Sequence, residues 1–175
     1  MRRITLFILL SFYQLTSFAQ PPVSPAHGID YPTGLENWRV ISTSLRQDND
    51  TQRVILGNSI AIDAARQGKT DPWPEGTILA KLVWKNRPHP IWKEAIVPGD
   101  FVHTEIMIKD SSRFNTTHHW GFARWVGNQL TPFGEDASAA ETCSNCHEAA
   151  KDSDYVFTVP AILPKPSTTD ESYSK

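Results

Sequence analysis

The sequence predicts an α+β domain that is mainly β, in which an antiparallel sheet is accompanied by a few short helices. Most of the apolar segments are short, rich in β-branched and aromatic residues, and bounded by Gly, Pro, Asn or Asp. Helical composition is confined to two stretches. The 175 residues are enough for one domain that buries a core of its own.

The expected strands follow one another along the middle of the chain. Each combines apolar residues with β-branched or aromatic side chains, as in WRVISTSL and RVILG. We expect strands at residues 38–45, 53–57, 77–84, 101–109 and 119–126, and a last short one at 155–158. Polar or Pro- and Gly-rich segments separate them and are expected to be turns or loops, at 47–51, 72–76 and 87–99.

Two helices are expected beside these strands. Ser59 is placed to cap a short helix at 60–67, and Gly68 would end it. Residues 136–150 contain several alanines, the residue with the highest helix propensity.

The N-terminus has the features of an export signal. Arg2 and Arg3 precede an apolar run at 4–12 and a small-residue site at 17–19. This order is typical of a secretory signal peptide, residues 1–19, although a buried N-terminal helix is the alternative. The apolar run is too short for a stable membrane anchor, and no cysteine follows the cleavage site to carry a lipid. We therefore expect an exported, periplasmic protein without a membrane anchor.

The rest of the chain divides into a main domain, residues 35–159, and two flanking segments. Residues 20–34 are rich in proline and are expected to wrap the surface. Residues 160–175 are polar and rich in Pro, Ser and Thr, which predicts a flexible tail. The formal net charge is −2 and no basic patch is present, so nucleic acids and anionic membranes are not expected partners.

The most informative motif is Cys143-Ser144-Asn145-Cys146-His147. C-x-x-C-H is the attachment signature of c-type haem, because two thiols at this spacing reach the two vinyl groups of one porphyrin. The imidazole that follows the second thiol binds the iron as its proximal ligand, here His147. One such motif predicts one covalent haem c, with its iron, attached through Cys143 and Cys146.

The same motif has other interpretations, namely a disulfide, a redox dithiol or half of a zinc site. The chain has 2 cysteines, so a zinc site with four cysteine ligands is impossible. A thioredoxin-type dithiol is expected near a βαβ pattern and does not require the histidine. Haem attachment is therefore the favoured interpretation.

Several segments outside the motif resemble the cytochrome P460 family of bacterial periplasmic haem proteins. In chain order they are Tyr31-Pro32 followed by Trp38, RVILGN at 53–58, WPEGT at 73–77 with Lys81 and Trp84, GFA at 121–123, and DYVFT at 154–158. The resemblance implies a single domain whose antiparallel sheet packs on one haem c, with the haem motif on a C-terminal helix or loop. It also implies a homodimer, and a sister group, the β-type cytochromes c-prime, that binds diatomic gases on the same scaffold.

Lys81 is the residue that separates the two groups. In the expected strand it shares a face with Leu79 and Val83, where a charged group must reach water, pair with an acid or react. The resemblance implies that a strand lysine in the P460 enzymes is bonded through its amine to the porphyrin edge. Lys81 matches that place best and Lys85 is the second candidate, whereas an edge-strand lysine that discourages aggregation is the alternative.

Candidates for the distal side of the iron come first from the strand at 101–109. It places Phe101, His103, Glu105, Met107 and Lys109 on one face. His103 or Met107 can serve as a sixth iron ligand, which would make an electron-transfer cytochrome. The alternative is that both are ordinary packed strand residues.

A distal carboxylate is implied by the resemblance, since the P460 enzymes use an acid shortly before the haem motif to accept substrate protons. The candidates here are Glu135, Asp136 and Glu141. Ala139 and Ala140 lie among them, and an alanine at the family position would leave the site without a general base.

The sequence therefore predicts an exported mono-haem protein with an open iron site opposite His147. The resemblance implies oxidation of hydroxylamine or a related small nitrogen species, with electrons passed to a periplasmic redox partner. The first alternative is a protein of the β-type cytochrome c-prime kind that binds nitric oxide without turnover. The second is a simple electron carrier.

Overall fold

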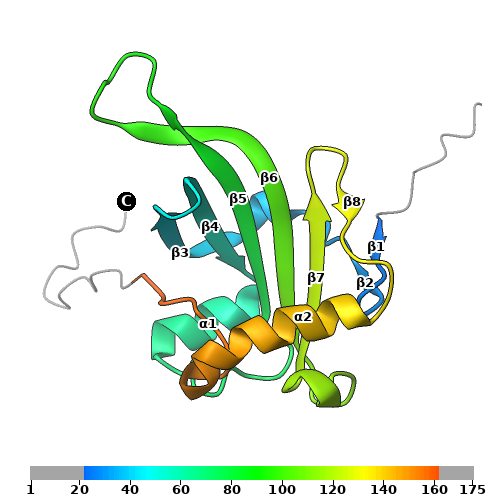
Figure 1. The fold of residues 1–175 in the computed structure, drawn as a ribbon. Helices are drawn as coiled ribbons and strands as arrows, with labels where there is room; N and C mark the ends of the chain where they lie inside the picture. Colours follow the sequence, from blue (N-terminus) through cyan, green and yellow to red (C-terminus); the bar gives the residue numbers. More distant parts are fainter. Residues whose placement is uncertain (1–21, 162–175) are drawn as a thin grey trace, which may run out of the picture.

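The computed structural model describes residues 22–161, which form a six-stranded antiparallel sheet with a two-stranded sheet beside it (Figure 1). The strands of the large sheet lie in chain order: β3 (Arg39–Arg46), β4 (Thr51–Gly57), β5 (Ile78–Pro88), β6 (Ile96–Lys109), β7 (Trp120–Val126) and β8 (Thr131–Pro132). The small sheet pairs β1 (Val23–Ser24) with β2 (Ile29–Asp30). The predicted mainly β, antiparallel fold is confirmed.

Short helices precede, interrupt and follow the strands of the large sheet. They are α1 (Ser59–Gln67), α2 (Ser138–His147) and the 3-10 helices η1 (Leu35–Asn37), η2 (Asn115–Thr117) and η3 (Glu148–Ser153). Both α-helices cross the end of the sheet at which β5 and β7 begin (Figure 1). Within residues 22–161, no helix is both long enough and apolar enough to cross a bilayer.

The first α-helix begins one residue earlier than predicted. Its cap is Asn58 rather than Ser59, since the Asn58 side chain accepts a hydrogen bond from the backbone N–H of Ala61 at 3.0 Å. An N-cap residue stays outside the helical conformation while its side chain satisfies a free N–H of the first turn. Gly68 ends the helix in the left-handed conformation, φ 67°, as predicted.

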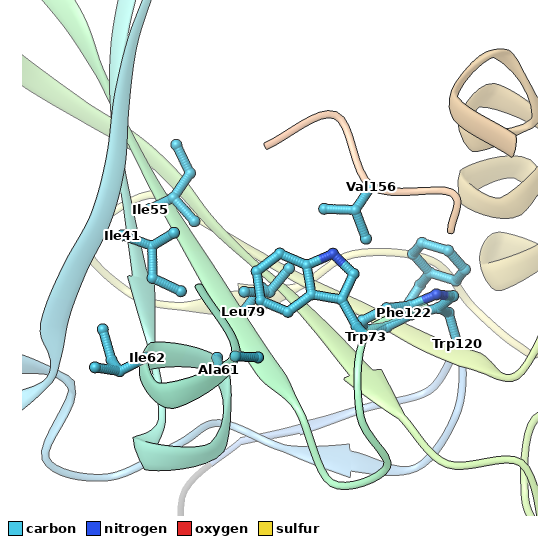
Figure 2. Close-up of a cluster of buried hydrophobic side chains, with 10 residues drawn as sticks. Ile41, Ile55, Ala61, Ile62, Trp73, Leu79, Trp120, Phe122 and Val156 are labelled. Carbon is cyan, nitrogen blue, oxygen red and sulfur yellow. The ribbon is translucent and has the colours of Figure 1, made fainter. Parts of the chain in front are cut away.

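Alternate side chains of the large sheet fill two separate apolar clusters. The cluster on the side of the helices comprises Ile41, Ile55, Ala61, Ile62, Ala64, Trp73, Leu79, Trp120, Phe122 and Val156, most of which Figure 2 shows. The cluster on the opposite side comprises Ile29, Leu35, Leu56, Ala80, Ile106, Phe114, Ala123 and Trp125. The second face is covered partly by the segment before β3, which the sequence predicted would wrap the surface.

The loop predicted at 87–99 is shorter than expected, because β5 continues to Pro88 and β6 begins at Ile96, which leaves residues 89–95 as the tip of a long hairpin (Figure 1). Pro88 pairs with Ile96, and Pro98 with Asn86. Both prolines lie beyond the ends of the flanking strands, since β4 stops pairing with β5 at Lys85 and β7 stops pairing with β6 at His103. Proline has no backbone N–H to donate. Where its nitrogen faces no neighbouring strand, it therefore costs no ladder hydrogen bond.

The predicted strand at 155–158 is also wrong, because no strand is found there. Asp154 and Tyr155 adopt the left-handed conformation, with φ 53° and 63°, which breaks the extended pattern. Val156 is buried against the helix-side cluster rather than paired in the sheet. The helix predicted at 136–150 starts at Ser138 and becomes 3-10 after His147.

The predicted signal peptide, residues 1–19, lies outside the described residues, as does the predicted tail beyond residue 161. The last described residues run along β3. The Ser42 hydroxyl donates to the carbonyl of Val159 at 2.7 Å, and the N–H of Ala161 donates to the carbonyl of Ile41 at 2.8 Å.

Candidate functional site

The haem motif lies on α2 and faces a cavity of about 470 Å³ between α2, the large sheet and the segment after η3. Cys143, Cys146 and His147 all line this cavity, because residues three and four apart on a helix share one face. Both thiols are free. The volume is in the range of cofactor and ligand pockets in proteins.

One wall of the cavity is apolar. It is formed by Leu79, Met107 and Phe122 of β5, β6 and β7, and by Val156 and Phe157 of the C-terminal segment. The rings of Phe122 and Phe157 each lie 5.1 Å from the His147 ring, measured between centroids. Such a wall suits the apolar faces of a planar macrocycle.

A row of charged side chains crosses the sheet beside this wall. The strand register pairs Lys81 with Glu105 and Glu105 with Arg124, so the three residues stand in line on β5, β6 and β7. Glu105 forms ion pairs with Lys81 and, at 2.5 Å, with Arg124 Nη2. All three line the cavity, and we call them the charged row.

The charged row keeps Glu105 ionised. Burial opposes the charge of this carboxylate, but Lys81 and Arg124 outweigh burial and lower its pKa to about 2. His103 also lines the cavity, with its Nε2 3.3 Å from Glu105 Oε1. Burial lowers the pKa of His103 to about 4, and the attraction of Glu105 is opposed by Arg124 and Lys81. His103 is therefore neutral at pH 7.

Sequence reasoning placed Glu105 on the same strand face as His103 and Met107 but did not select it as the carboxylate of the site. A signal was present, since an acid and a lysine occupy the middle of two consecutive expected strands. Only the register between β5 and β6 puts Glu105 directly opposite Lys81. That register also depends on two shifts in the β5–β6 ladder, on either side of Trp84, which no local pattern in the sequence specifies.

The structure does not bring the predicted acids or the second lysine to the cavity. Glu135, Asp136 and Glu141 are exposed, and none of them lines it. Lys85 is exposed as well and donates a hydrogen bond to the carbonyl of Asn49 at 3.0 Å. The β5–β6 ladder shifts register on both sides of Trp84, so Lys85 does not continue the row that Lys81 begins.

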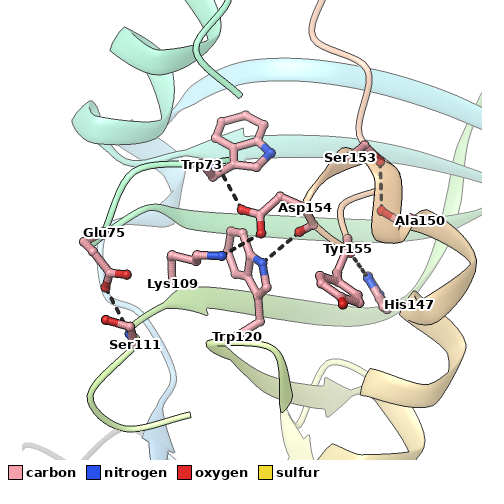
Figure 3. Close-up of polar contacts among 10 residues, drawn as sticks. All are labelled: Trp73, Glu75, Lys109, Ser111, Trp120, His147, Ala150, Ser153, Asp154 and Tyr155. Carbon is pink, nitrogen blue, oxygen red and sulfur yellow. Dashed lines mark hydrogen bonds and ion pairs between the residues drawn. The ribbon is translucent and has the colours of Figure 1, made fainter. Parts of the chain in front are cut away.

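His147 is held by the turn that follows η3 (Figure 3). Its Nδ1 lies 2.6 Å from the carbonyl oxygen of Tyr155. A carbonyl can only accept, so Nδ1 carries the proton and Nε2 keeps a lone pair for a metal ion. Burial lowers the pKa of His147, which favours the same neutral imidazole.

A family model described as Cytochrome P460 matches residues 32–158, a span that includes the haem motif and every wall of the cavity described above. The chain belongs to the cytochrome P460 family. It is therefore a haem-binding cytochrome, and the resemblance seen in the sequence is confirmed. A comparison with curated proteins found no match.

The residues around the cavity fit the haem of a cytochrome P460. Two free thiols and an imidazole with an available Nε2 line one cavity that has an apolar wall, as haem c requires. Arg53 lines the same cavity, and its buried Nε has no hydrogen-bond partner, which suits a carboxylate group of the cofactor. In the part of the chain that the structure describes, no three His, Cys, Asp or Glu side chains gather as a site for a bare metal ion.

Proposed function

We propose that this cytochrome P460 is an exported protein with one covalent haem c that oxidises hydroxylamine or a related small nitrogen species. The observation that carries the proposal is the cavity in which the haem motif of α2 faces the charged row on the sheet. Family membership supports the haem, and the pattern of residues 1–19 supports export to the periplasm.

Three residues of the motif would hold the cofactor. Cys143 and Cys146 would bond to it through their sulfur atoms, and His147 would bind its iron through Nε2. The bound haem supplies an iron that coordinates the substrate nitrogen and takes up electrons. Oxidation of hydroxylamine to nitric oxide releases three protons and three electrons. The protons need acceptors in the cavity, and we propose a periplasmic redox protein as the one-electron acceptor.

Glu105 and His103 are the proton acceptors that the cavity offers. Glu105 is ionised, but with a pKa of about 2 it is a weak base while both of its cationic partners are present. His103 is neutral and close enough to Glu105 to pass a proton on. Arg124 contacts Glu105 Oε1 at 2.5 Å and orients its carboxylate.

We propose that the amine of Lys81 is bonded to the porphyrin edge. This bond would make the Glu105 carboxylate more basic. Forming the N–C bond removes one hydrogen from nitrogen and one from carbon, a two-electron oxidation that requires an oxidant such as a peroxide. The bonded amine no longer carries the positive charge of a free ammonium group. Glu105 would then face one cation instead of two, and its pKa would rise toward its ordinary value.

A second function is favoured by the ion pair between Lys81 and Glu105. A lysine held as an ammonium group by a carboxylate is not a nucleophile. If the pair persists in the haem-loaded protein, the cavity would capture nitric oxide without turnover. A third function, electron transfer, would require Met107 or His103 of the cavity to bind the iron.

Turnover of hydroxylamine by a Lys81→Leu variant tests the proposal. Arg124 still pairs with Glu105 in this variant, so we expect it to keep its haem and fold while losing turnover with an artificial electron acceptor. Lys85→Leu is the matched control, because Lys85 lies on the same strand outside the cavity and should keep activity. We also expect peptide mass spectrometry to find the Lys81 peptide joined to the haem peptide.

The opposite result favours gas binding. If the unmodified protein shows neither the lysine adduct nor hydroxylamine turnover, the enzyme proposal is wrong and nitric oxide capture is the better account. We also propose a homodimer, as the resemblance implies, and light scattering on the purified protein tests it.

A further inference from the structure

The turn that contacts His147 has a backbone conformation that needs support. Asp154 and Tyr155 are consecutive non-glycine residues with φ 53° and 63°. The left-handed region is unfavourable for residues with a side chain, so two in succession persist only where surrounding contacts hold them. The carbonyl of Tyr155, at the end of this turn, accepts the hydrogen bond from His147 Nδ1.

Three groups from distant parts of the chain hold Asp154 in place (Figure 3). Lys109 Nζ of β6 contacts Asp154 Oδ1 at 2.6 Å, and the backbone N–H of Trp73 donates to Oδ2 at 2.9 Å. The Trp120 ring of β7 donates from Nε1 to the Asp154 carbonyl at 2.8 Å. Both carboxylate oxygens and the backbone oxygen therefore have partners.

These groups are taken almost completely out of water. Lys109 is 6% exposed, Asp154 9%, and Trp120 is fully buried. Removing an ion pair from water is costly, and an apolar pair of similar size often stabilises a fold as well or better. Stability alone therefore does not explain this ion pair. The pair also fixes a geometry, namely the position of the Tyr155 carbonyl.

The outer side of the turn is held as well. The Tyr155 ring stacks on His118, with centroids 3.9 Å apart and planes at 6°. His118 in turn contacts Glu148 at 2.5 Å, next to the haem motif. The turn is thus packed between the buried ion pair on one side and this stack on the other.

We propose that Lys109, Asp154 and Trp120 are positioning residues that set the strength of the bond between His147 and the haem iron. They act through the Tyr155 carbonyl: a well-placed acceptor draws the Nδ1 proton and increases electron donation from Nε2 to the metal. The proposal rests on the haem ligation by His147 stated under the proposed function. It does not depend on which substrate the cavity takes.

The iron–histidine stretching frequency in the resonance Raman spectrum of the ferrous protein tests the proposal. We expect Trp120→Phe, which removes the indole N–H together with part of the ring system, and Asp154→Asn, which removes the charge, to shift this band to lower frequency at full haem content. Glu75→Gln is the matched control, because it weakens the contact of Glu75 with the Ser111 N–H, away from the turn, and should leave the band unchanged.

The two failures are distinguishable. If the ferrous iron is five-coordinate and high-spin and still shows no iron–histidine band, His147 is not the ligand, and both the haem site and this inference are overturned. If the band is present but stays unchanged in Trp120→Phe, the positioning role is overturned while the proposed haem site stands. Trp120→Phe carries this test even where Asp154→Asn fails to fold, since it keeps an aromatic ring in the core and leaves the buried ion pair in place.

Discussion

Glu105 shows how much of the site depends on a single register. The alternation along β6 puts it on a face with His103 and Met107, and that much follows from the sequence. Its ion pairs with Lys81 and Arg124 follow from strand pairing across β5, β6 and β7, which no local pattern specifies. The acids before the haem motif were selected by family analogy, and the helix that begins at Ser138 leaves them exposed.

The low pKa of Glu105 predicts a specific acid sensitivity. Its pKa is about 2 in the fold against an ordinary value of 4.5. Stability from its ion pairs is therefore complete above pH 4.5 and is lost as the pH falls through about 2. In the haem-free protein, where Lys81 and Arg124 are both free cations, we expect Glu105→Gln to lower the free energy of urea unfolding at pH 7 and to flatten its decline below pH 4.5. The exposed Glu141→Gln should change neither.

The spin state of ferric iron is a second prediction at this scale. With His147 as the single protein ligand, the ferric protein should be high-spin or water-bound and should bind cyanide readily. His103 and Met107 both line the cavity, so they are the residues that could change this result. A low-spin resting spectrum that is lost in Met107→Ala or His103→Ala would instead identify an electron carrier.

Elements were predictable where their signals are local. α1 has a capping side chain, alternating small and apolar residues and a terminal glycine within one short segment, and it was expected within one residue of its observed start. The strand expected at 155–158 failed because Val156 is buried by contact with the core and Phe157 lines the cavity, and neither pairs in the sheet. Pattern alone does not distinguish these two ways of burying a valine.

The corrected helix cap gives a prediction at the scale of the element. Asn58 accepts from the N–H of Ala61 and of Ile78, and it donates to the carbonyl of Gly76 at 2.8 Å. Asn58→Ala should therefore lower the free energy of unfolding by roughly 1–2 kcal/mol in urea titrations. Ser59→Ala should cost less than about 0.5 kcal/mol, as expected of a residue that makes no capping bond. Equal losses would mean that the cap is not Asn58.

At the scale of the whole molecule, the cavity is the space between the large sheet and the helical and C-terminal segments that pack on it. α2 and the segment after η3 close one side and the large sheet closes the other, so a bound haem would complete the packing. The sequence predicted the haem from the motif, and the sheet beside it from the strand pattern and the family resemblance. The order in which strands, helices and C-terminal segment surround the space emerges only in the folded chain.

The most direct test of this account is mass spectrometry of the exported protein after denaturation in acidified solvent. If Cys143 and Cys146 both bond to one porphyrin, the polypeptide should keep the mass of one haem, and digestion should place it on the peptide that contains residues 143–147. Cys143→Ala combined with Cys146→Ala should release it. Recovery of free haem from the unmodified protein, or of a product that contains zinc, would contradict the account.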